Sequence, residues 1–266
     1  MSVIPLSASD LALAAVLVLV LAAVTTRMQL RLGRPILISA ARTAIQLLLL
    51  GLILRTLFAH AQWHWVALMS SIMLLVASHE VVARQDRTAG GLWSFGAGSV
   101  SMFASSFVLT VFALWTVIGA EPWYAPRYAI PLLGMLLGNT MTGIALSMNN
   151  MTQSAWQQRR VIEQRLLLGE TRVQALEDIR RQSARTGMIP TINAMAAAGV
   201  VSVPGMMTGQ LFAGSAPFDA VKYQILIMFL IAASTGAGVI AAQYLLTRRL
   251  FDERDRLRLE RLAGRD

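Results

Sequence analysis

The chain has 266 residues, of which 56% are hydrophobic and only 14% are charged, and it contains no cysteine. Too few polar residues remain to cover a soluble domain, while several apolar runs reach the ~20 residues that a membrane-spanning helix needs. The lack of cysteine excludes disulfides, thiolate metal sites and cysteine nucleophiles. The sequence therefore predicts an all-α polytopic membrane protein.

Apolar runs predict seven transmembrane helices. In chain order they cover residues 9–26, 36–58, 64–82, 92–118, 129–148, 190–211 and 221–246. No basic residue precedes Arg27, so the first run does not have the charge pattern of a cleavable signal peptide. We expect it to be retained as a span.

The net charge of +9 follows this predicted topology. The segments after the first, third, fifth and seventh spans hold 19 of the 23 Lys and Arg residues. By the positive-inside rule, the N-terminus is predicted outside and the C-terminus in the cytoplasm. Aromatic residues gather at the predicted outer ends, as an interfacial belt would: Trp63, Trp65, Trp123, Tyr124 and Tyr128. The charge therefore indicates membrane orientation and not nucleic-acid binding.

The connection between the fifth and sixth spans is long, about 40 residues, which is unusual for a structureless loop. Strong helix formers flank Gly169, and glycine is common just past a helix C-terminus. Thr171 and Gln174 then form a capping box for a second helix. We expect two cytoplasmic helices that meet at a sharp turn. They either pack on their own protein, lie in the membrane interface, or present the turn to a soluble partner.

The segment GVVSVPGMMTGQLFAG is rich in residues that weaken helices. Gly205 and Gly209 form a G-x-x-x-G motif, as Gly134 and Gly138 do in an earlier span. Such motifs let helices approach closely in lipid, and Pro204 removes a backbone donor that lipid cannot replace. We expect this segment to face protein or a transport pathway.

Polar side chains inside the predicted spans are candidates for substrate contacts. Glu80 next to His79 combines a carboxylate with an imidazole, a pair that suits a divalent metal ion. The structural alternative is an ion pair of Glu80 with Arg84, four residues on, or with Arg42 of the second span. Asn139 is expected to hydrogen-bond to another helix.

Methionines in the same region bind soft metal ions but also fill irregular packing, and both alternatives stay open. The candidate pathway residues are His79, Glu80, Asn139, Met141, Met206, Met207 and Gln210. None of them has the spacing of a tight metal site, so no bound metal is assigned.

Glu163, Gly169 and Ile179 match in type and spacing the E-A-A-x-x-x-G-x9-I-x-L-P signature of permease subunits of ABC transporters, although the alanines and the final Leu-Pro are replaced. In that family this segment is the coupling helix that contacts the ATP-binding subunit. A wider resemblance is carried by ARTAIQLLLLG, GMLLGNTMTGIALSM, IEQRLLLGETRVQA and PTINAMAAAGVVSVPGMMTGQLFAG. These segments resemble the FetB family, which comprises bacterial permease subunits linked to iron export and related to plant proteins of aluminium tolerance.

The resemblance implies one transmembrane permease domain over residues 1–266, with a coupling region at 149–189 and a cytoplasmic tail at 247–266. It implies a multi-pass protein of the bacterial inner membrane that pairs with a second copy of itself and with a soluble FetA-like ATP-binding subunit. ATP and Mg would be bound by that partner, and this chain would be neither an enzyme nor a cofactor carrier. The residues expected to couple to the ATP-binding subunit are Glu163, Gly169, Thr171 and Ile179.

One observation independently supports the assignment of ATP binding to a separate subunit. A P-loop needs Gly-Lys followed by Ser or Thr, and the only lysine, Lys222, follows Val221. The main alternative is a stand-alone secondary transporter of a cation or small solute, against which stand the cytoplasmic helix pair and the lack of buried acids for a proton relay. An intramembrane enzyme ranks last, because no Gly-x-Ser-Gly motif is present.

The tail is expected to form a solvated helix, with a second partner contact as the alternative.

Overall fold

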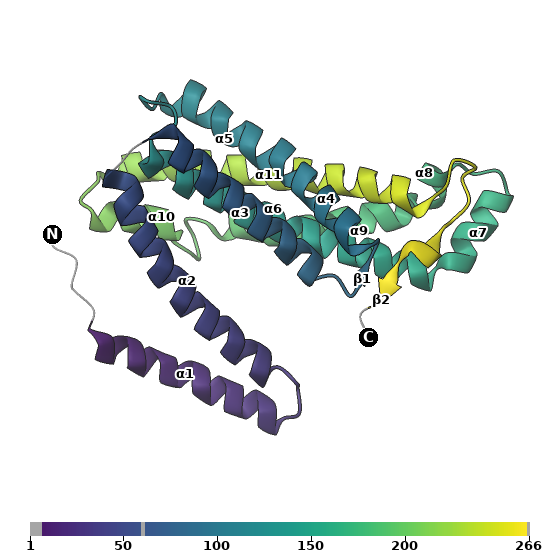
Figure 1. Cartoon of the computed structure of the whole chain (residues 1–266), viewed down its shortest axis with the longest axis horizontal. Coiled ribbons are helices and arrows are strands. Elements are labelled where there is room, and N and C mark those ends of the chain that lie inside the picture. The colour runs from purple at the N-terminus through teal and green to yellow at the C-terminus, as the bar shows by residue number, and fades with distance from the viewer. Residues whose placement is uncertain (1–6, 60–61, 265–266) are drawn as a thin grey trace.

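The computed structural model describes residues 7–59 and 62–264, so the ends of the predicted 1–266 domain lie outside the described residues (Figure 1). Over these residues the named elements are helices apart from one pair of two-residue strands, which confirms the predicted all-α class. The elements are α1 (Ala8–Arg27), α2 (Gly33–Ala59), α3 (Trp63–Ala83), β1 (Arg87–Thr88), α4 (Gly91–Met102), η1 (Phe103–Phe107), α5 (Val108–Phe112), η2 (Ala113–Ile118), α6 (Pro126–Gln157), α7 (Arg159–Leu167), α8 (Arg172–Ala175), α9 (Glu177–Ala197), α10 (Gly205–Phe212), α11 (Pro217–Leu250), η3 (Leu259–Arg261) and β2 (Ala263–Gly264).

Among the described residues, six helices are long and apolar enough to cross a membrane. They are α1, α2, α3, the continuous run from α4 to η2, α6 and α11, and they coincide with six of the seven predicted spans. The run from α4 to η2 contains two stretches of π-helix, whose wider turns still keep the backbone hydrogen-bonded within the segment.

A continuous span over residues 190–211 does not form, and that prediction is wrong. Helix α9 starts well before it, runs through Pro190 and ends at Ala197, and α10 begins only at Gly205. Gly199, with φ of 81°, and Pro204 lie in the break, because neither residue type favours a continuous helix there.

The centre of the bundle is built from α6, α9 and α11, which approach closely at glycines. A Cβ atom on Gly187 would lie 2.6 Å from the carbonyl oxygen of Gly143, and one on Gly238 would lie 2.6 Å from Thr140. These positions leave no room for a side chain, so glycine here permits backbone contact between helices. The two predicted G-x-x-x-G motifs do not make these contacts.

Hydroxyl and amide groups join the same helices inside the bundle. Ser234 of α11 lies 2.8 Å from Thr140 and 3.0 Å from Ser106, counted between hydroxyl oxygens. Further along, the Gln243 amide donates to the Ser147 hydroxyl at 2.9 Å and to the Arg180 carbonyl at 3.1 Å. Helices α6 and α11 therefore run parallel, and the chain returns between them through α9 and α10.

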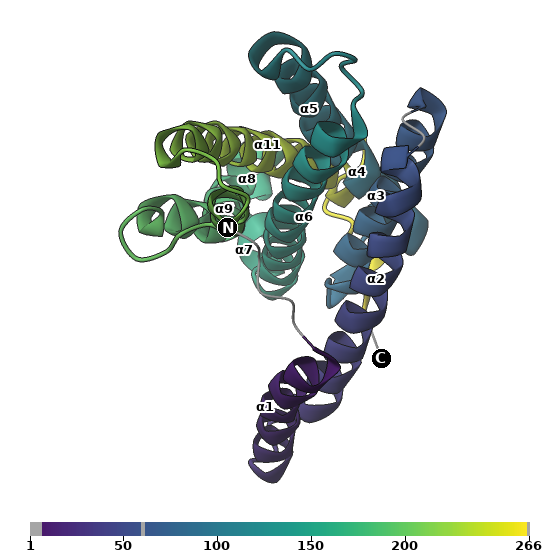
Figure 2. The ribbon, with the colours of Figure 1, turned by 90° about the vertical axis from the view of Figure 1, so that its left-hand side faces the viewer.

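Helices α1 and α2 form a hairpin that leans away from this bundle (Figures 1 and 2). None of residues 34–56 is buried in the structure. The hairpin turn itself is tight, since a Cβ on Gly33 would clash with Thr26.

The end of the bundle that carries α7, α8 and most of the arginines is called here the arginine-rich end. The tail after Leu250 folds back onto this end and does not form the predicted solvated helix. Phe251, Leu259 and Leu262 are buried in the core there, and β2 pairs antiparallel with β1. The apolar residues of the tail explain the difference, because folding back removes them from water.

Candidate functional site

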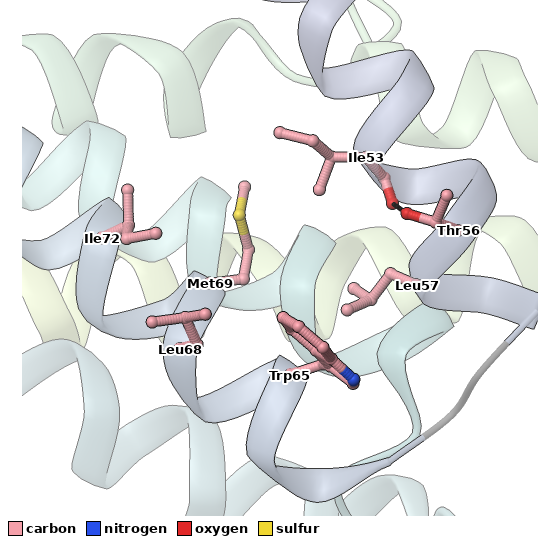
Figure 3. Close-up of a pocket in the computed structure, with 7 residues that line it drawn as sticks. All are labelled: Ile53, Thr56, Leu57, Trp65, Leu68, Met69 and Ile72. Atoms are coloured by element: carbon pink, nitrogen blue, oxygen red, sulfur yellow. Dashed lines mark hydrogen bonds between the residues drawn. The ribbon is translucent and has the colours of Figure 1, made fainter.

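A continuous cleft separates α2 from α3 and α6. Its apolar part has a volume of about 520 Å³ and is lined by Ile53, Thr56 and Leu57 of α2 and by Trp65, Leu68, Met69 and Ile72 of α3, which face one another in Figure 3. A second groove of about 760 Å³ shares Ile53, Met69 and Ile72 with the first. The cleft therefore extends along much of the length of α2.

The second groove ends in a cluster of charges near the arginine-rich end. Arg42 of α2 donates from Nη2 to Oε1 of Glu80 at 2.5 Å, and Arg84 lies 3.9 Å from the other carboxylate oxygen. Both pairings that the sequence suggested for Glu80 are therefore present. Only 19% of the Glu80 side chain is exposed, so the carboxylate is held inside the groove between two guanidinium groups.

The groove brings together two of the seven predicted pathway residues, Glu80 and Met141. The thioether residues Met69 and Met73 line it as well, together with the polar Ser39, Thr43 and Gln46 of α2. Gly134 and Gly138 also lie on its wall, so this G-x-x-x-G motif faces the groove. A Cβ on Gly138 would meet no atom within 4 Å.

His79 and Asn139 lie outside this groove. The His79 side chain is exposed on another face of α3, so its imidazole does not join the Glu80 carboxylate in the groove lining. The Asn139 amide donates to the Met135 carbonyl of its own helix at 2.8 Å, and the predicted interhelical bond is wrong for this residue. The neighbouring Thr140 makes that interhelical contact instead.

Met206, Met207 and Gln210 lie on α10, away from the groove. Met206 packs against the apolar cluster at the end of the bundle remote from the arginines. The three side chains are partly buried, and the Gln210 Oε1 atom has no hydrogen-bond partner among the described residues. Five of the seven predicted pathway residues thus divide into a groove set, Glu80 and Met141, and an α10 set, Met206, Met207 and Gln210, while His79 and Asn139 belong to neither.

The chemistry of the groove suits weak, transient contacts. Within the described chain, no three His, Asp or Glu side chains come together as a tight metal site would require. One carboxylate held by two arginines, with thioether sulfurs further along, offers a metal ion few ligands at any one position. Any cation that reaches Glu80 has to compete with Arg42 and Arg84.

A second candidate site is the turn between α7 and α8. Helix α7 ends where the Gly169 and Glu170 amides donate to Leu166 and Arg165 carbonyls, and Gly169 has φ of 93°. Thr171 and Gln174 form the predicted capping box, with both of its hydrogen bonds present. The turn is therefore held in one conformation by its own residues.

Arg165 braces this turn from inside. Its guanidinium lies 3.2 Å from Glu170 and 3.2 Å from Asp178, and it reaches the Ala175 carbonyl at 3.4 Å. Arg172 lies 3.5 Å from Asp255, so the turn is also joined to the folded-back tail.

The apolar residues that project from the turn, Leu167 and Leu168, are not among the four that the sequence singled out. Leu167 and Leu168 are 87% and 85% exposed, whereas Ile179 is buried in the core. Glu163, Gly169 and Thr171 are exposed. Two adjacent leucines before the turn glycine, in an arginine-rich segment, are the signal that would have identified this surface.

The comparisons with known proteins cover nearly the whole chain. The family described as "Uncharacterised protein family (UPF0014)" matches residues 8–251. The chain is similar to the UPF0014 membrane protein slr1647 of Synechocystis sp., with 38% identity over 86% of this chain and 87% of the relative. It is also similar to the "Probable iron export permease protein FetB" of Escherichia coli, at 32% identity over 93% of each chain. The Arabidopsis thaliana protein ALUMINUM SENSITIVE 3 shares 29% identity over 87% of this chain and 83% of its own. No solved structure matches the chain.

Proposed function

The chain belongs to the UPF0014 family of membrane proteins, and from this premise we propose that it is the membrane-spanning permease subunit of an ABC transporter. It is a multi-pass membrane protein of the permease kind. ATP hydrolysis takes place on a separate, soluble FetA-like subunit that binds ATP and Mg, and the chain works as a homodimer in a bacterial inner membrane. The substrate is a metal ion that is exported, and iron is the first candidate because one relative is named as a probable iron export permease.

We also propose the topology that this function needs. The N-terminus lies outside and the arginine-rich end lies in the cytoplasm, in line with the positive-inside rule. Because α6 and α11 run parallel, α9 and α10 together provide a seventh, discontinuous crossing between them.

The observation that carries the proposal is the braced turn between α7 and α8. Leu167 and Leu168 are exposed at the tip of a turn whose base is buried through Ile162 and Leu176. Apolar side chains that a rigid element holds in water are typical of a surface that docks into a partner. The position matches the coupling segment of the permeases that the sequence resembles.

The substrate pathway is proposed along the cleft beside α2, with Glu80 and Met141 as contacts. The groove set supports this proposal because it joins a carboxylate to thioether groups along one continuous cavity. His79, Asn139 and the α10 set are not included, since they line other surfaces.

The test is co-purification of the tagged chain with its genomic neighbours in mild detergent, followed by an ATPase assay. We expect a P-loop ATPase to co-purify, and we expect the double variant L167E/L168E to lose it while still inserting into the membrane. Gly169→Val should have the same effect, because a β-branched residue does not tolerate the positive φ. The matched control is Leu92→Glu, an exposed leucine near the same end on another helix.

Two outcomes contradict the proposal. If L167E/L168E retains the ATPase and its activity, the turn is not the docking element. If the chain purifies alone and moves metal ions in vesicles without nucleotide, it is a secondary transporter.

A further inference from the structure

The crossing formed by α9 and α10 is interrupted by non-helical backbone at residues 198–204. Val200 and Val201 in this break are 87% and 82% exposed. Their amides donate to the Ala197 carbonyl, but none of the described residues donates a hydrogen bond to the carbonyl oxygens of Gly199, Val200 or Val201. Exposed valines and unpartnered carbonyls thus occur side by side.

The depth of the break follows from the packing of α9 against α11. A Cβ on Gly187 would lie 3.2 Å from Val239, so these two residues are level with each other. The helices are antiparallel, since Arg180 meets Gln243. Ala197 lies ten residues beyond Gly187, about 15 Å along the helix, which is level with Phe229.

Phe229 is well inside the membrane-crossing part of α11. It lies seven residues from Lys222, about 10 Å, and 19 residues from Arg248, about 28 Å. The hydrocarbon core is about 30 Å thick, so a layer centred between these two charges includes the level of Phe229. The break therefore begins within the hydrocarbon core, and any tilt of α9 brings its start closer to the centre.

Non-helical backbone at this depth is tolerated only where protein or an enclosed aqueous cavity covers it. The hairpin of α1 and α2 lies on the other side of the bundle from the green segment that contains the break (Figure 2). A soluble partner reaches only the ends of the bundle. Any protein that covers the break at this depth, or encloses an aqueous cavity around it, is therefore another membrane-spanning chain.

Helix α10 indicates which chain this is. Gly205 and Gly209 form its G-x-x-x-G motif, and a Cβ on either residue would meet no atom within 4 Å. The backbone of α10 is thus bare along this face, in contrast to Gly143 and Gly187, whose faces are filled by neighbouring helices. A G-x-x-x-G face typically pairs with another such face by close backbone approach, which a second copy of the same chain supplies.

We propose that a second copy of this chain docks on the α9–α10 surface, defined as Met195, Val200, Val201, Val203, Gly205 and Gly209. The two copies are related by a two-fold axis that passes near the break. The inference rests on the proposed dimeric permease and names the surface by which the dimer forms. It places the exposed carbonyls of both copies at their shared interface.

The test uses the lack of cysteine in the chain, which makes single-cysteine cross-linking unambiguous. Val201→Cys, expressed without any ATPase and oxidised in native membranes, should give a disulfide-linked species of twice the mass. The depth-matched control is Phe112→Cys, half exposed on α5 away from α10, which should remain monomeric (Figure 2).

A second variant tests the bare face of α10. Gly209→Leu should remove most of the Val201→Cys cross-link without reducing the amount of inserted protein, because nothing in the chain itself occupies that space. Gly51→Leu, at an equally open glycine of α2, should leave the cross-link unchanged.

The proposal is overturned if Val201→Cys stays monomeric, if it links to a protein of another mass, or if Phe112→Cys links equally well. Because the ATPase is absent from this experiment, a missing cross-link speaks against the dimer surface, and a missing ATPase in the co-purification speaks against the coupling turn.

Discussion

The most apolar stretches of helices α1 and α11 have the same mean hydropathy and very different surroundings. In α11, 44% of the most apolar stretch is buried in protein, against 11% in α1. Helix α11 carries Ser234, Thr235 and Gly238 on its buried side, whereas α1 between its ends is made of Leu, Val and Ala. In lipid, apolar character does not drive helices together, and small or hydroxyl-bearing residues mark the faces that pack.

The same difference separates the two walls of the cleft. The α6–α9–α11 bundle is fixed by backbone contact at glycines and by internal hydrogen bonds, while α2 is attached near its two ends. Leu57 is buried at one end, and Arg42 pairs with Glu80 towards the other. The cleft lies where α2 stays apart from the bundle, since none of residues 34–56 is buried.

The largest effect should come from filling a glycine contact in the bundle. Gly187→Ala puts a methyl group 2.6 Å from the Gly143 carbonyl oxygen, so backbone has to move. Overpacking of this kind costs about 1–3 kcal/mol, and we expect the thermal unfolding temperature in detergent to fall by several degrees.

The matched control is Gly51→Ala on α2, where the added methyl group meets nothing within 4 Å. It should leave the unfolding temperature within about one degree, since surface changes away from special features are nearly neutral. Equal losses in both variants would mean that the two regions do not differ in packing.

This contrast also shows how far the sequence could be interpreted. Hydropathy and length placed six spans, because the bilayer imposes both, and only α6 departs by more than a few residues, ending at Gln157 instead of residue 148. Hydropathy and length failed at residues 190–211, because this apolar segment contains glycines and a proline and does not form one continuous helix. Which glycines pack was not predictable either, since Gly143 and Gly187 form no local motif and meet only through the tertiary fold.

The next largest effect should come from breaking the Arg42–Glu80 ion pair, which joins α2 to the bundle. Glu80→Gln removes the largely buried carboxylate with which Arg42 and Arg84 form ion pairs. The Arg42 side chain is half exposed, so we expect a cost of about 1–2 kcal/mol, between that of a surface and a buried pair, and a roughly tenfold lower transport rate in vesicles.

A charge swap distinguishes a structural from a pathway role. In R42E/E80R the ion pair between positions 42 and 80 is restored with its polarity reversed, but the arginine at position 80 then lies beside Arg84, so thermal stability should return only in part. Transport should stay low if the Glu80 carboxylate contacts the substrate, as proposed. Recovery of transport in the double variant would leave Glu80 with a structural role only.

The candidate sites were only partly predictable for the same reason as the fold. The capping box and the turn glycine are local signals, and both are present as expected. The pairing of Arg42 with Glu80 was one of two stated alternatives, and both occur. Ile179 and His79 were assigned by motif and by adjacency, but helix geometry turns one into the core and the other away from the groove.

The smallest effect concerns the tail after Leu250 and tests whether Asp252 holds it against the α6–α9–α11 bundle. Asp252 lies just after α11 and accepts hydrogen bonds from the Arg256 and Arg254 amides and from the Arg256 and Arg258 side chains. The bonds from Arg256 and Arg254, the Arg256 amide first, lower the pKa of Asp252 to about 2. A free aspartate has a pKa of about 3.9. Because the folded pKa is lowered, the stabilising contribution is complete above about pH 4 and is lost as the pH falls towards 2.

Asp252→Asn reproduces the uncharged state at neutral pH, so trypsin should cut the tail faster at Arg254, Arg256 and Arg258 while the rest of the chain stays resistant. Glu253→Gln is the neighbouring control, because Glu253 is exposed and makes no ion pair within the described structure. If both variants are cut at the wild-type rate, Asp252 does not hold the tail, and its attachment rests on buried Phe251, Leu259 and Leu262 alone. The tail would then be held on the bundle by apolar contacts alone. Such contacts stabilise the tail because it lies outside the bilayer, where burial removes apolar side chains from water, whereas within lipid they would not.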